Sequence, residues 1–353
     1  MRLEKRTEVS PAAFVIAPIA AVAFTLLVSS LLVLWAGAPV GPTWAALLRG
    51  GFGSVFAWSE TLTRATPLIL TGLAVTVAFK ARLFNIGAEG QLYGGALAAV
   101  AVGGLHDGSG FALPHALLFV LMLLAAAVAG ALLLLGPALM KAKLGVDEVV
   151  TTLLLNFIVL LAVSALLDGA MKDPTAMGWP QSVGLVPELE LRKLITGTRV
   201  HTGLLAAGAI AIALWGLFKY TLPGFEIRAT GANAAAAGFA GVPVTKTVVM
   251  VALMSGAIAG LAGAIEVAGR TGYVTLDMSP GYGYTGIVIA MLAALHPLAV
   301  VAAGVFVAGV LVGADSMSRA INVPTYIADV IVAASLISVL VATMLTQYRV
   351  RMR

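Results

Sequence analysis

The chain has 353 residues, of which 60% are hydrophobic and only 10% are charged. A soluble domain carries roughly 25% charged residues, so the composition excludes a water-exposed globular surface and predicts an all-α integral membrane protein. The chain has no cysteine and only four scattered histidines, which excludes disulfides and disfavours a metal cluster. We interpret the net charge of +5 as an orientation signal rather than as affinity for nucleic acid.

The apolar runs divide the chain into about ten predicted spans joined by polar segments. Residues 1–11 form a basic tail, and the first run is about 24 residues long, which favours an uncleaved helix over a signal peptide. In chain order the predicted spans cover residues 12–35, 62–79, 90–103, 114–135, 145–167, 201–219, 247–268, 287–295, 298–314 and 325–345. The fourth is expected to stop at Gly136-Pro137, and residues 315–324 are expected to form a loop. Residues 12–346 then form one transmembrane domain, followed by a basic tail at 347–353.

The distribution of lysine and arginine predicts that both termini are cytoplasmic, because most basic residues then fall on the inside. Residues 168–200 become a long external loop. The spans at 90–103 and 287–295 are short, so eight to ten crossings fit the sequence. Residues 72–85 resemble residues 260–273, and each stretch leads into a glycine-rich polar break. This likeness predicts two inverted five-helix halves around a central path.

The stretch LFNIGAEGQLYGG places Asn85, Glu89 and Gln91 between two apolar spans. Polar groups at membrane depth must find a partner or line a wet path. Two interpretations stay open. The stretch is either a turn and helix start near the cytoplasmic face, or part of the wall or gate of a translocation path for a solute rich in hydrogen-bonding groups.

Four further polar positions lie in or beside the predicted spans. Asn156 is expected to make an interhelical hydrogen bond and is a candidate for the path. Glu266 lies four residues before Arg270, which predicts an ion pair near the outer interface. Tyr282 and Tyr284 lie in the glycine-rich break at 271–286 and are candidate path or gate residues.

The segment 220–246 differs from the other connections because it is alanine-rich in its middle and polar at both ends. Asn233 is a suitable N-cap for a short helix over 234–240, which Gly241 and Pro243 would end. Such a helix has little large apolar surface for anchoring in lipid. We therefore expect it to dock into a groove of another protein, with a solvated connector as the alternative.

Catalytic signatures are missing from the sequence. It contains no G-x-S-x-G, no H-E-x-x-H and no Walker A motif. An enzyme is therefore disfavoured, and if transport uses ATP, the ATPase must be another chain.

Three blocks of the sequence together resemble one known family. LFNIGAEGQLYGGALAA, DEVVTTLLLNFI and IRATGANAAAAGFAGVPVTKT are similar to blocks of the permease subunits of bacterial ABC importers. The family is that of branched-chain amino-acid, ribose and nucleoside permeases. The likeness covers residues 60–345 and is strongest to the branch that serves nucleosides and simple sugars.

The resemblance implies a non-enzymatic subunit with about ten helices in the bacterial plasma membrane. It also implies a second homologous permease, most simply a paralogue, two cytoplasmic ATPases that bind ATP and magnesium, and an extracytoplasmic solute-binding lipoprotein. No cofactor is expected on this chain. Five positions match the family's cytoplasmic coupling segment: Gly231, Asn233, Ala237, Gly238 and Gly241. Ala234 stands where many relatives have proline.

The sequence thus supports a channel-forming half of an ATP-driven importer for a nucleoside or related sugar-like solute. Branched-chain amino acids or another small polar solute are the alternative substrates. The rival mechanism is an ion-coupled secondary transporter, in which Glu89 or Glu266 would carry protons.

Overall fold

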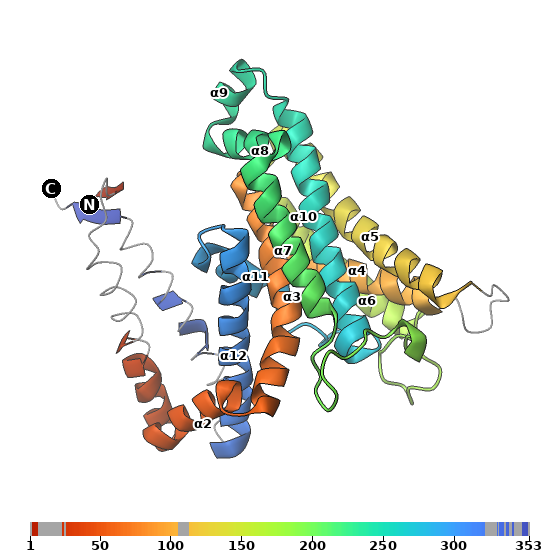
Figure 1. The fold of residues 1–353 in the computed structure, drawn as a ribbon, viewed down its shortest axis with the longest axis vertical. Helices are drawn as coiled ribbons and strands as arrows, with labels where there is room; N and C mark the ends of the chain where they lie inside the picture. The colour runs from red at the N-terminus through yellow and green to blue at the C-terminus, as the bar shows by residue number, and fades with distance from the viewer. Residues whose placement is uncertain are drawn as a thin grey trace. The chain divides into compact units, whose positions relative to one another are not determined.

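The computed structural model describes residues 2–5, 23–24, 26–104, 113–321 and, beyond these, residues 330, 332–334, 337–338, 341 and 348–351. The described chain is nearly all helical (Figure 1). It divides into two compact units, one formed by Met1–Leu62 with Phe306–Arg353 and the other by Thr63–Val305. Each unit is treated by itself below.

The larger unit, Thr63–Val305, contains the helices that position the candidate site. Helix α3 enters it from the smaller unit and α12 leaves it. The elements are α3 (Val55–Lys80), α4 (Ala88–Gly103), α5 (His115–Leu144), α6 (Glu148–Asp168), the 3-10 turn η2 (Pro187–Leu189), α7 (Gly203–Tyr220), α8 (Leu222–Ala232), α9 (Ala234–Phe239), α10 (Val244–Glu266), the π-helical turn η3 (Val267–Thr271), α11 (Tyr282–Leu292) and α12 (Pro297–Ile321).

The smaller unit contains a bent helical pair and a short strand pair. Residues Leu26–Trp35 and helix α2 (Val40–Phe52) meet at an angle of 116°. Strand β1 (Arg2–Lys5) pairs antiparallel with β2 (Tyr348–Arg351), so the two ends of the chain lie side by side (Figure 1). The sequence did not predict these strands.

Six of the described helices are long and apolar enough to cross a membrane, or seven if the bent pair is one span. They are α3, α5, α6, α7, α10 with its π-turn, and α12. The protein is therefore a multi-pass membrane protein. Helix α11 is apolar but has only 11 residues, and α4 has only 16, as their short apolar runs led us to expect. About half of the predicted span at 12–35 and most of the one at 325–345 lie outside the described residues.

Four predicted boundaries were wrong. Helix α3 begins at Val55, seven residues earlier than predicted. Helix α5 continues through Pro137 to Leu144, because a long membrane helix tolerates proline where neighbouring groups satisfy the freed carbonyl. Residues 315–321 continue α12 instead of forming a loop, and Asp315 and Ser318 both have polar or electrostatic partners there. Helix α11 begins at Tyr282, five residues earlier than predicted, because Gly281 takes a left-handed conformation immediately before it.

The core of the larger unit is the packing of α4 against α5 and α10. Eleven of the 16 residues of α4 are buried. The backbones approach closely at glycines: a Cβ on Gly260 of α10 would overlap the Ala126 carbonyl of α5, and a Cβ on Gly263 would overlap the Leu92 carbonyl of α4. Such close approach at small residues is the usual way in which membrane helices gain dispersion contacts.

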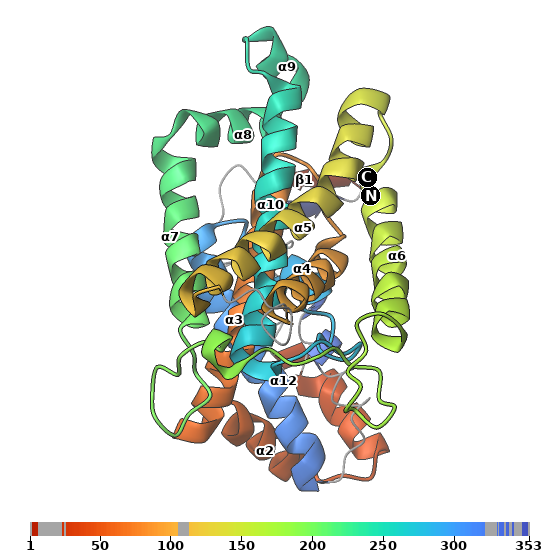
Figure 2. The same cartoon turned by 90° about the vertical axis from the view of Figure 1, so that its right-hand side faces the viewer.

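The segments predicted to lie on opposite sides of the membrane occupy opposite ends of α7. Residues 168–200 precede its first turn, and α8 and α9 follow its last turn (Figures 1 and 2). A helix of 18 residues is about 27 Å long, close to the thickness of the bilayer's hydrocarbon core. The geometry therefore allows residues 168–200 and the α8–α9 segment to face different compartments.

The glycine contacts predict that a change to alanine affects the free energy of unfolding differently at two positions. Gly260→Ala should lower the free energy of unfolding by about 1–3 kcal/mol, because its methyl group meets backbone that cannot move aside. Gly208→Ala in α7 should be neutral or stabilising, because nothing lies within 4 Å of its Cβ and alanine is the better helix former. Thermal unfolding of the two variants in detergent compares them. Equal midpoints would contradict the packing described here.

Candidate functional site

The candidate site is built around a break in the backbone between α3 and α4. Residues 81–87 are not helical, and Arg82 has a φ of +55°. Leu83 and Asn85 are fully buried, and Gly87 is buried as well. Buried peptide groups outside a helix must find hydrogen-bond partners elsewhere, because an unpaired group costs several kcal/mol in a membrane.

Those partners come from one polar stripe of α6, formed by Glu148, Thr152 and Asn156 at intervals of four residues. Glu148 Oε1 accepts from Phe84 N at 3.0 Å, and Thr152 Oγ1 accepts from Ile86 N at 3.1 Å. Four-residue spacing puts the three side chains on one face of the helix. The stripe thus replaces the hydrogen bonds that a continuous helix would have made.

Asn156 is the last residue of this stripe along α6 and is fully buried. Its Nδ2 donates to Ile86 O at 2.8 Å, and its Oδ1 accepts from Gly90 N in the first turn of α4 at 2.8 Å. The predicted interhelical hydrogen bond of Asn156 is confirmed, with backbone groups as its principal partners. Asn156 therefore fixes both the end of the break and the start of α4.

The N-terminal end of the stripe carries a cation. Lys141 of α5 forms an ion pair with Glu148 and donates to Arg82 O at 2.6 Å. Asp147, one residue earlier, caps α6 by accepting from Val149 N at 2.8 Å. The break is thus held from two helices, α5 and α6.

Asn85 and Gln91 form a buried amide pair that closes the break onto α4. Each side chain donates to the other at 2.9 Å, and Asn85 Oδ1 also accepts from Gly87 N. Asn85 Nδ2 donates further to Ser255 Oγ of α10 at 3.1 Å, and Ser255 donates to Ala74 O of α3 at 2.7 Å. The amide pair therefore joins α3, α4 and α10.

Glu89 connects α4 to the second broken segment. Its Oε2 accepts from Gly283 N, in the first turn of α11, at 2.6 Å. A carboxylate is favoured at a helix N-terminus, where backbone N–H groups are unpaired. Glu89 is only 3% exposed, and a Cβ on Gly283 would overlap the Glu89 backbone. The starts of α4 and α11 therefore meet directly at this carboxylate.

The two tyrosines take different positions beside this contact. Tyr282 is buried, and its carbonyl accepts from Thr71 Oγ1 of α3 at 3.0 Å. Tyr284 is 37% exposed, and its hydroxyl accepts from Asn156 Nδ2 at 3.1 Å. The structure thus gathers all six predicted path or gate residues around the two broken segments. Five of them are buried, and Tyr284 alone of the six is exposed.

Sequence reasoning missed Glu148, Thr152 and Ser255 as partners of this network. The four-residue spacing of Glu148, Thr152 and Asn156 was the signal that could have found the stripe. The expected Glu266–Arg270 ion pair is present, but Glu266 is fully buried instead of lying at an interface. Arg270 lies in the π-turn after α10, and the charge of Arg64 also acts on Glu266. Two cations therefore favour the buried carboxylate.

The segment 220–246 forms a second candidate site, at the far end of α7. Asn233 accepts from Ala236 N at 3.1 Å, which confirms it as the N-cap of α9. Gly231 is buried, and a Cβ there would overlap the Lys80 carbonyl of α3, so this glycine packs α8 instead of offering a surface. Gly238 is exposed with only Val244 nearby, and exposed Gly241 has a φ of +88°.

The outer face of α9 presents Phe239, which is 98% exposed. Ala237, on the opposite face, is buried. The sequence predicted a surface of small residues and missed this projecting aromatic ring. A ring without contacts at the tip of a short helix is suited to insertion into a pocket of another protein.

Two adjacent threonines allow a matched test of the α6 stripe. Thr152→Val should lower the free energy of unfolding by about 1–3 kcal/mol, because it leaves the Ile86 N–H without its acceptor. Thr151→Val should change it by less than about 0.5 kcal/mol, because that hydroxyl donates only to carbonyls of its own helix. Thermal unfolding in detergent gives the comparison. A larger loss for Thr151→Val would show that the stripe does not hold the break.

The comparisons with known proteins agree with this architecture. The family model described as branched-chain amino acid transport system / permease component matches residues 57–340. The chain is 35% identical over 318 residues to the guanosine ABC transporter permease NupP of Bacillus subtilis, covering 90% of both chains. It is 40% identical over 309 residues to the glucose ABC transporter permease TsgB13 of Haloferax volcanii, covering 84% of this chain and 79% of the relative. It is 29% identical over 254 residues to NupQ, a second guanosine ABC transporter permease of Bacillus subtilis, covering 70% and 77%. The chain therefore belongs to the branched-chain amino acid transport system permease family, whose members are the membrane channel subunits of ABC transporters.

Proposed function

We propose that this chain forms the translocation path of an ATP-driven importer for a nucleoside in a bacterial plasma membrane. The observation that carries this assignment is the 35% identity, over nine-tenths of both chains, to a guanosine permease. The chain moves its solute without covalent chemistry. Binding and hydrolysis of ATP with magnesium take place on partner chains, in keeping with the lack of a Walker A motif here.

The proposed topology has ten spans in two inverted halves, with both termini and the α8–α9 segment in the cytoplasm and residues 168–200 outside. Two features support it. The chain ends pair as strands and so lie on one side, which requires an even number of crossings. Each of the two broken segments also ends a long helix and starts a short one, α4 or α11, as two related halves would do.

The proposed partners are a second permease, two ATPase domains and an extracytoplasmic solute-binding lipoprotein. The likeness of this chain to both NupP and NupQ, two guanosine permeases of one organism, favours a paralogue as the second permease. The α9 end of the α8–α9 segment is the proposed contact with an ATPase. In this assignment Gly231 and Ala237 hold the segment to the body, Asn233 and Gly241 fix the ends of α9, and Gly238 and Phe239 touch the partner.

The hydrogen-bond network around Asn85 and Glu89 is proposed as the hinge of the gate. Asn85, Gln91 and Asn156 hold the start of α4, and Glu89 holds α11 against it. A movement of α4 relative to α11 would open or close the path beside the exposed Tyr284. In this proposal the movements that give alternating access are those of α4 and α11, whose first turns meet at Glu89.

A sugar is the second candidate substrate, because the glucose permease is 40% identical to this chain. An ion-coupled transporter is disfavoured by family membership and by the fixed partners of Glu89 and Glu266. Uptake separates the substrates. Proteoliposomes carrying the complete importer, with ATP inside and the solute-binding protein outside, should accumulate radiolabelled guanosine and not glucose. Accumulation driven by a proton gradient without ATP would contradict the importer itself.

The coupling assignment predicts the effect of a charge at the tip of α9. Gly238→Arg should abolish the solute-stimulated part of ATP hydrolysis by the assembled complex, because the arginine fills the proposed contact. The protein should still fold and insert, since only Val244 lies near the site of the new side chain.

Phe239→Ala should reduce the same stimulation, and Phe225→Ala serves as its control. Phe225 is also an exposed ring of the segment, at 52%, but it belongs to α8. ATP hydrolysis by the assembled complex with and without solute-loaded binding protein gives the measurement. Full stimulation in Gly238→Arg and Phe239→Ala would refute the assignment of α9 to the ATPase contact.

A further inference from the structure

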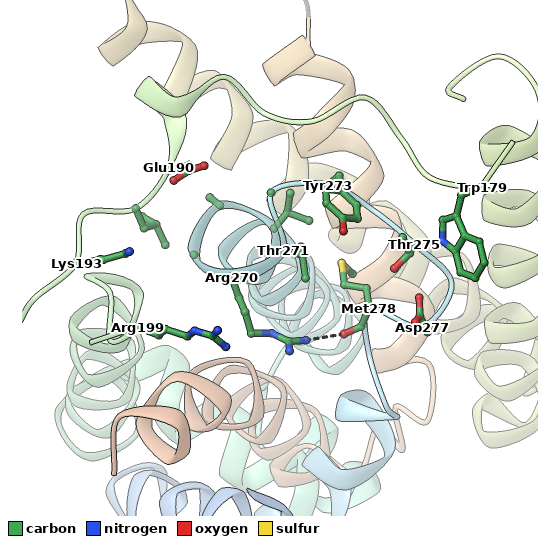
Figure 3. Close-up of a pocket in the computed structure, with 15 residues that line it drawn as sticks. Trp179, Glu190, Lys193, Arg199, Arg270, Thr271, Tyr273, Thr275, Asp277 and Met278 are labelled. Atoms are coloured by element: carbon green, nitrogen blue, oxygen red, sulfur yellow. Dashed lines mark hydrogen bonds between the residues drawn. The ribbon is translucent and has the colours of Figure 1, made fainter. Parts of the chain in front are cut away.

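A polar cavity of about 610 Å³ lies at the end of the larger unit opposite α8 and α9. The loop at 168–200 and the segment from η3 to Met278 form its wall (Figure 3). None of the path or gate residues predicted from the sequence lines it. Its volume falls in the range of small-molecule sites, about 300–1,000 Å³.

Backbone hydrogen bonds between its two walls build this cavity before any ligand binds. Leu185 N donates to Gly272 O at 2.7 Å, and Leu191 N donates to Ala268 O at 2.8 Å. Ser182 N donates to Val274 O at 3.0 Å. The external loop is therefore fixed to the end of α10 instead of being a free connection, and the cavity keeps its shape.

Opposite kinds of side chain face each other across the cavity. Trp179, Thr275 and Asp277 lie on one side, and Lys193, Arg199 and Arg270 lie on the other (Figure 3). Glu190 completes the charged lining. Arg270 is paired with Glu266, so the two remaining cations are balanced by Asp277 and Glu190. A balanced lining suits a neutral solute with many hydrogen-bonding groups better than an ion.

Buried polar atoms next to the cavity lack partners within the described chain. They are Thr271 Oγ1 in its lining, Glu266 Oε2 beside Arg270, and Nε2 of His201, whose ring lies directly behind Gly269. Burial lowers the pKa of His201 to about 4, so the ring is neutral. Its Nδ1 accepts from Gly203 N at 3.2 Å, which leaves Nε2 as the donor. Unpaired buried polar atoms point to water or a ligand that pairs with them.

We propose that this cavity is the outer solute site, where the chain first receives a purine nucleoside. Asp277 accepts hydrogen bonds from the vicinal hydroxyls of the ribose, and Trp179 offers a face for stacking. The guanidinium of Arg199 donates to the acceptor edge of the base, as arginine does to guanine O6 and N7. This inference rests on the proposed function, and it adds a binding site on this chain that is separate from the buried hinge.

Direct binding of radiolabelled guanosine to the assembled importer in nanodiscs, without the solute-binding protein, tests this site. Asp277→Asn and Arg199→Gln should each weaken the Kd about tenfold or more, because each removes a charged hydrogen-bond partner. Glu188→Gln and Arg192→Gln are the matched controls, since both residues are exposed in the same loop and neither lines the cavity. The controls should bind as the unmodified complex does, and glucose should not compete.

Uptake and direct binding together separate the outer site from the substrate assignment. Guanosine uptake by the complete importer, together with an unchanged Kd in Asp277→Asn and Arg199→Gln, would overturn only the outer site. Uptake without any measurable binding to the importer alone would do the same. Uptake of glucose and not of guanosine would overturn both the substrate assignment and the outer site.

Discussion

A stretch of buried backbone without helical hydrogen bonds is the constraint on which the larger unit depends. Leu83, Asn85 and Gly87 are buried in the turn between α3 and α4, where water does not satisfy peptide groups. Glu148, Thr152 and Asn156 of α6 bond to the backbone of Phe84 and Ile86, and Asn85 Oδ1 bonds to Gly87 N. The remaining N–H groups of the break bond to nearby backbone carbonyls. The break joins α3 to α4, whereas its side-chain partners lie mainly on α6. The break is therefore stabilised only when these three helices pack together.

This constraint explains why the glycines of the core lie where they do. The break places α4 in the middle of the unit, and α4 can pack there only if α5 and α10 approach it closely. Gly260 and Gly263 permit that approach because their missing Cβ atoms would overlap neighbouring carbonyls. A second break, before α11, then brings another helix start against Glu89. The result is a closely packed set of helices in which the starts of the two short helices, α4 and α11, meet at Glu89.

Long packed helices and two short helices that meet at one carboxylate suit a channel that opens to alternate sides. At one end of α7, the exposed ring of Phe239 and the uncrowded Gly238 offer a small contact through which a partner could push. At the other end, a preformed cavity with balanced charge offers hydrogen bonds to a neutral solute. Asn85 and Glu89, which we propose as part of a hinge, lie in the helices between these ends, and their side chains bond to other groups of the protein.

The sequence by itself determined the protein class, most of the long helices, the short helix capped by Asn233 and the Glu266–Arg270 pair, because these depend on composition, on apolar run length or on residues a few positions apart. It also identified the stretch around Asn85 as unusual, without showing whether its polar groups face a solute or each other. Only the tertiary structure decided that they face each other, with Asn156 and Thr152 from a helix more than sixty residues later. Likewise, the burial of Gly231 and the exposure of Phe239 follow from how α8 packs on α3 and how α9 projects from it. Periodicity and capping act within one helix, whereas the partner of a buried polar group depends on which helices pack together, and local sequence does not specify that.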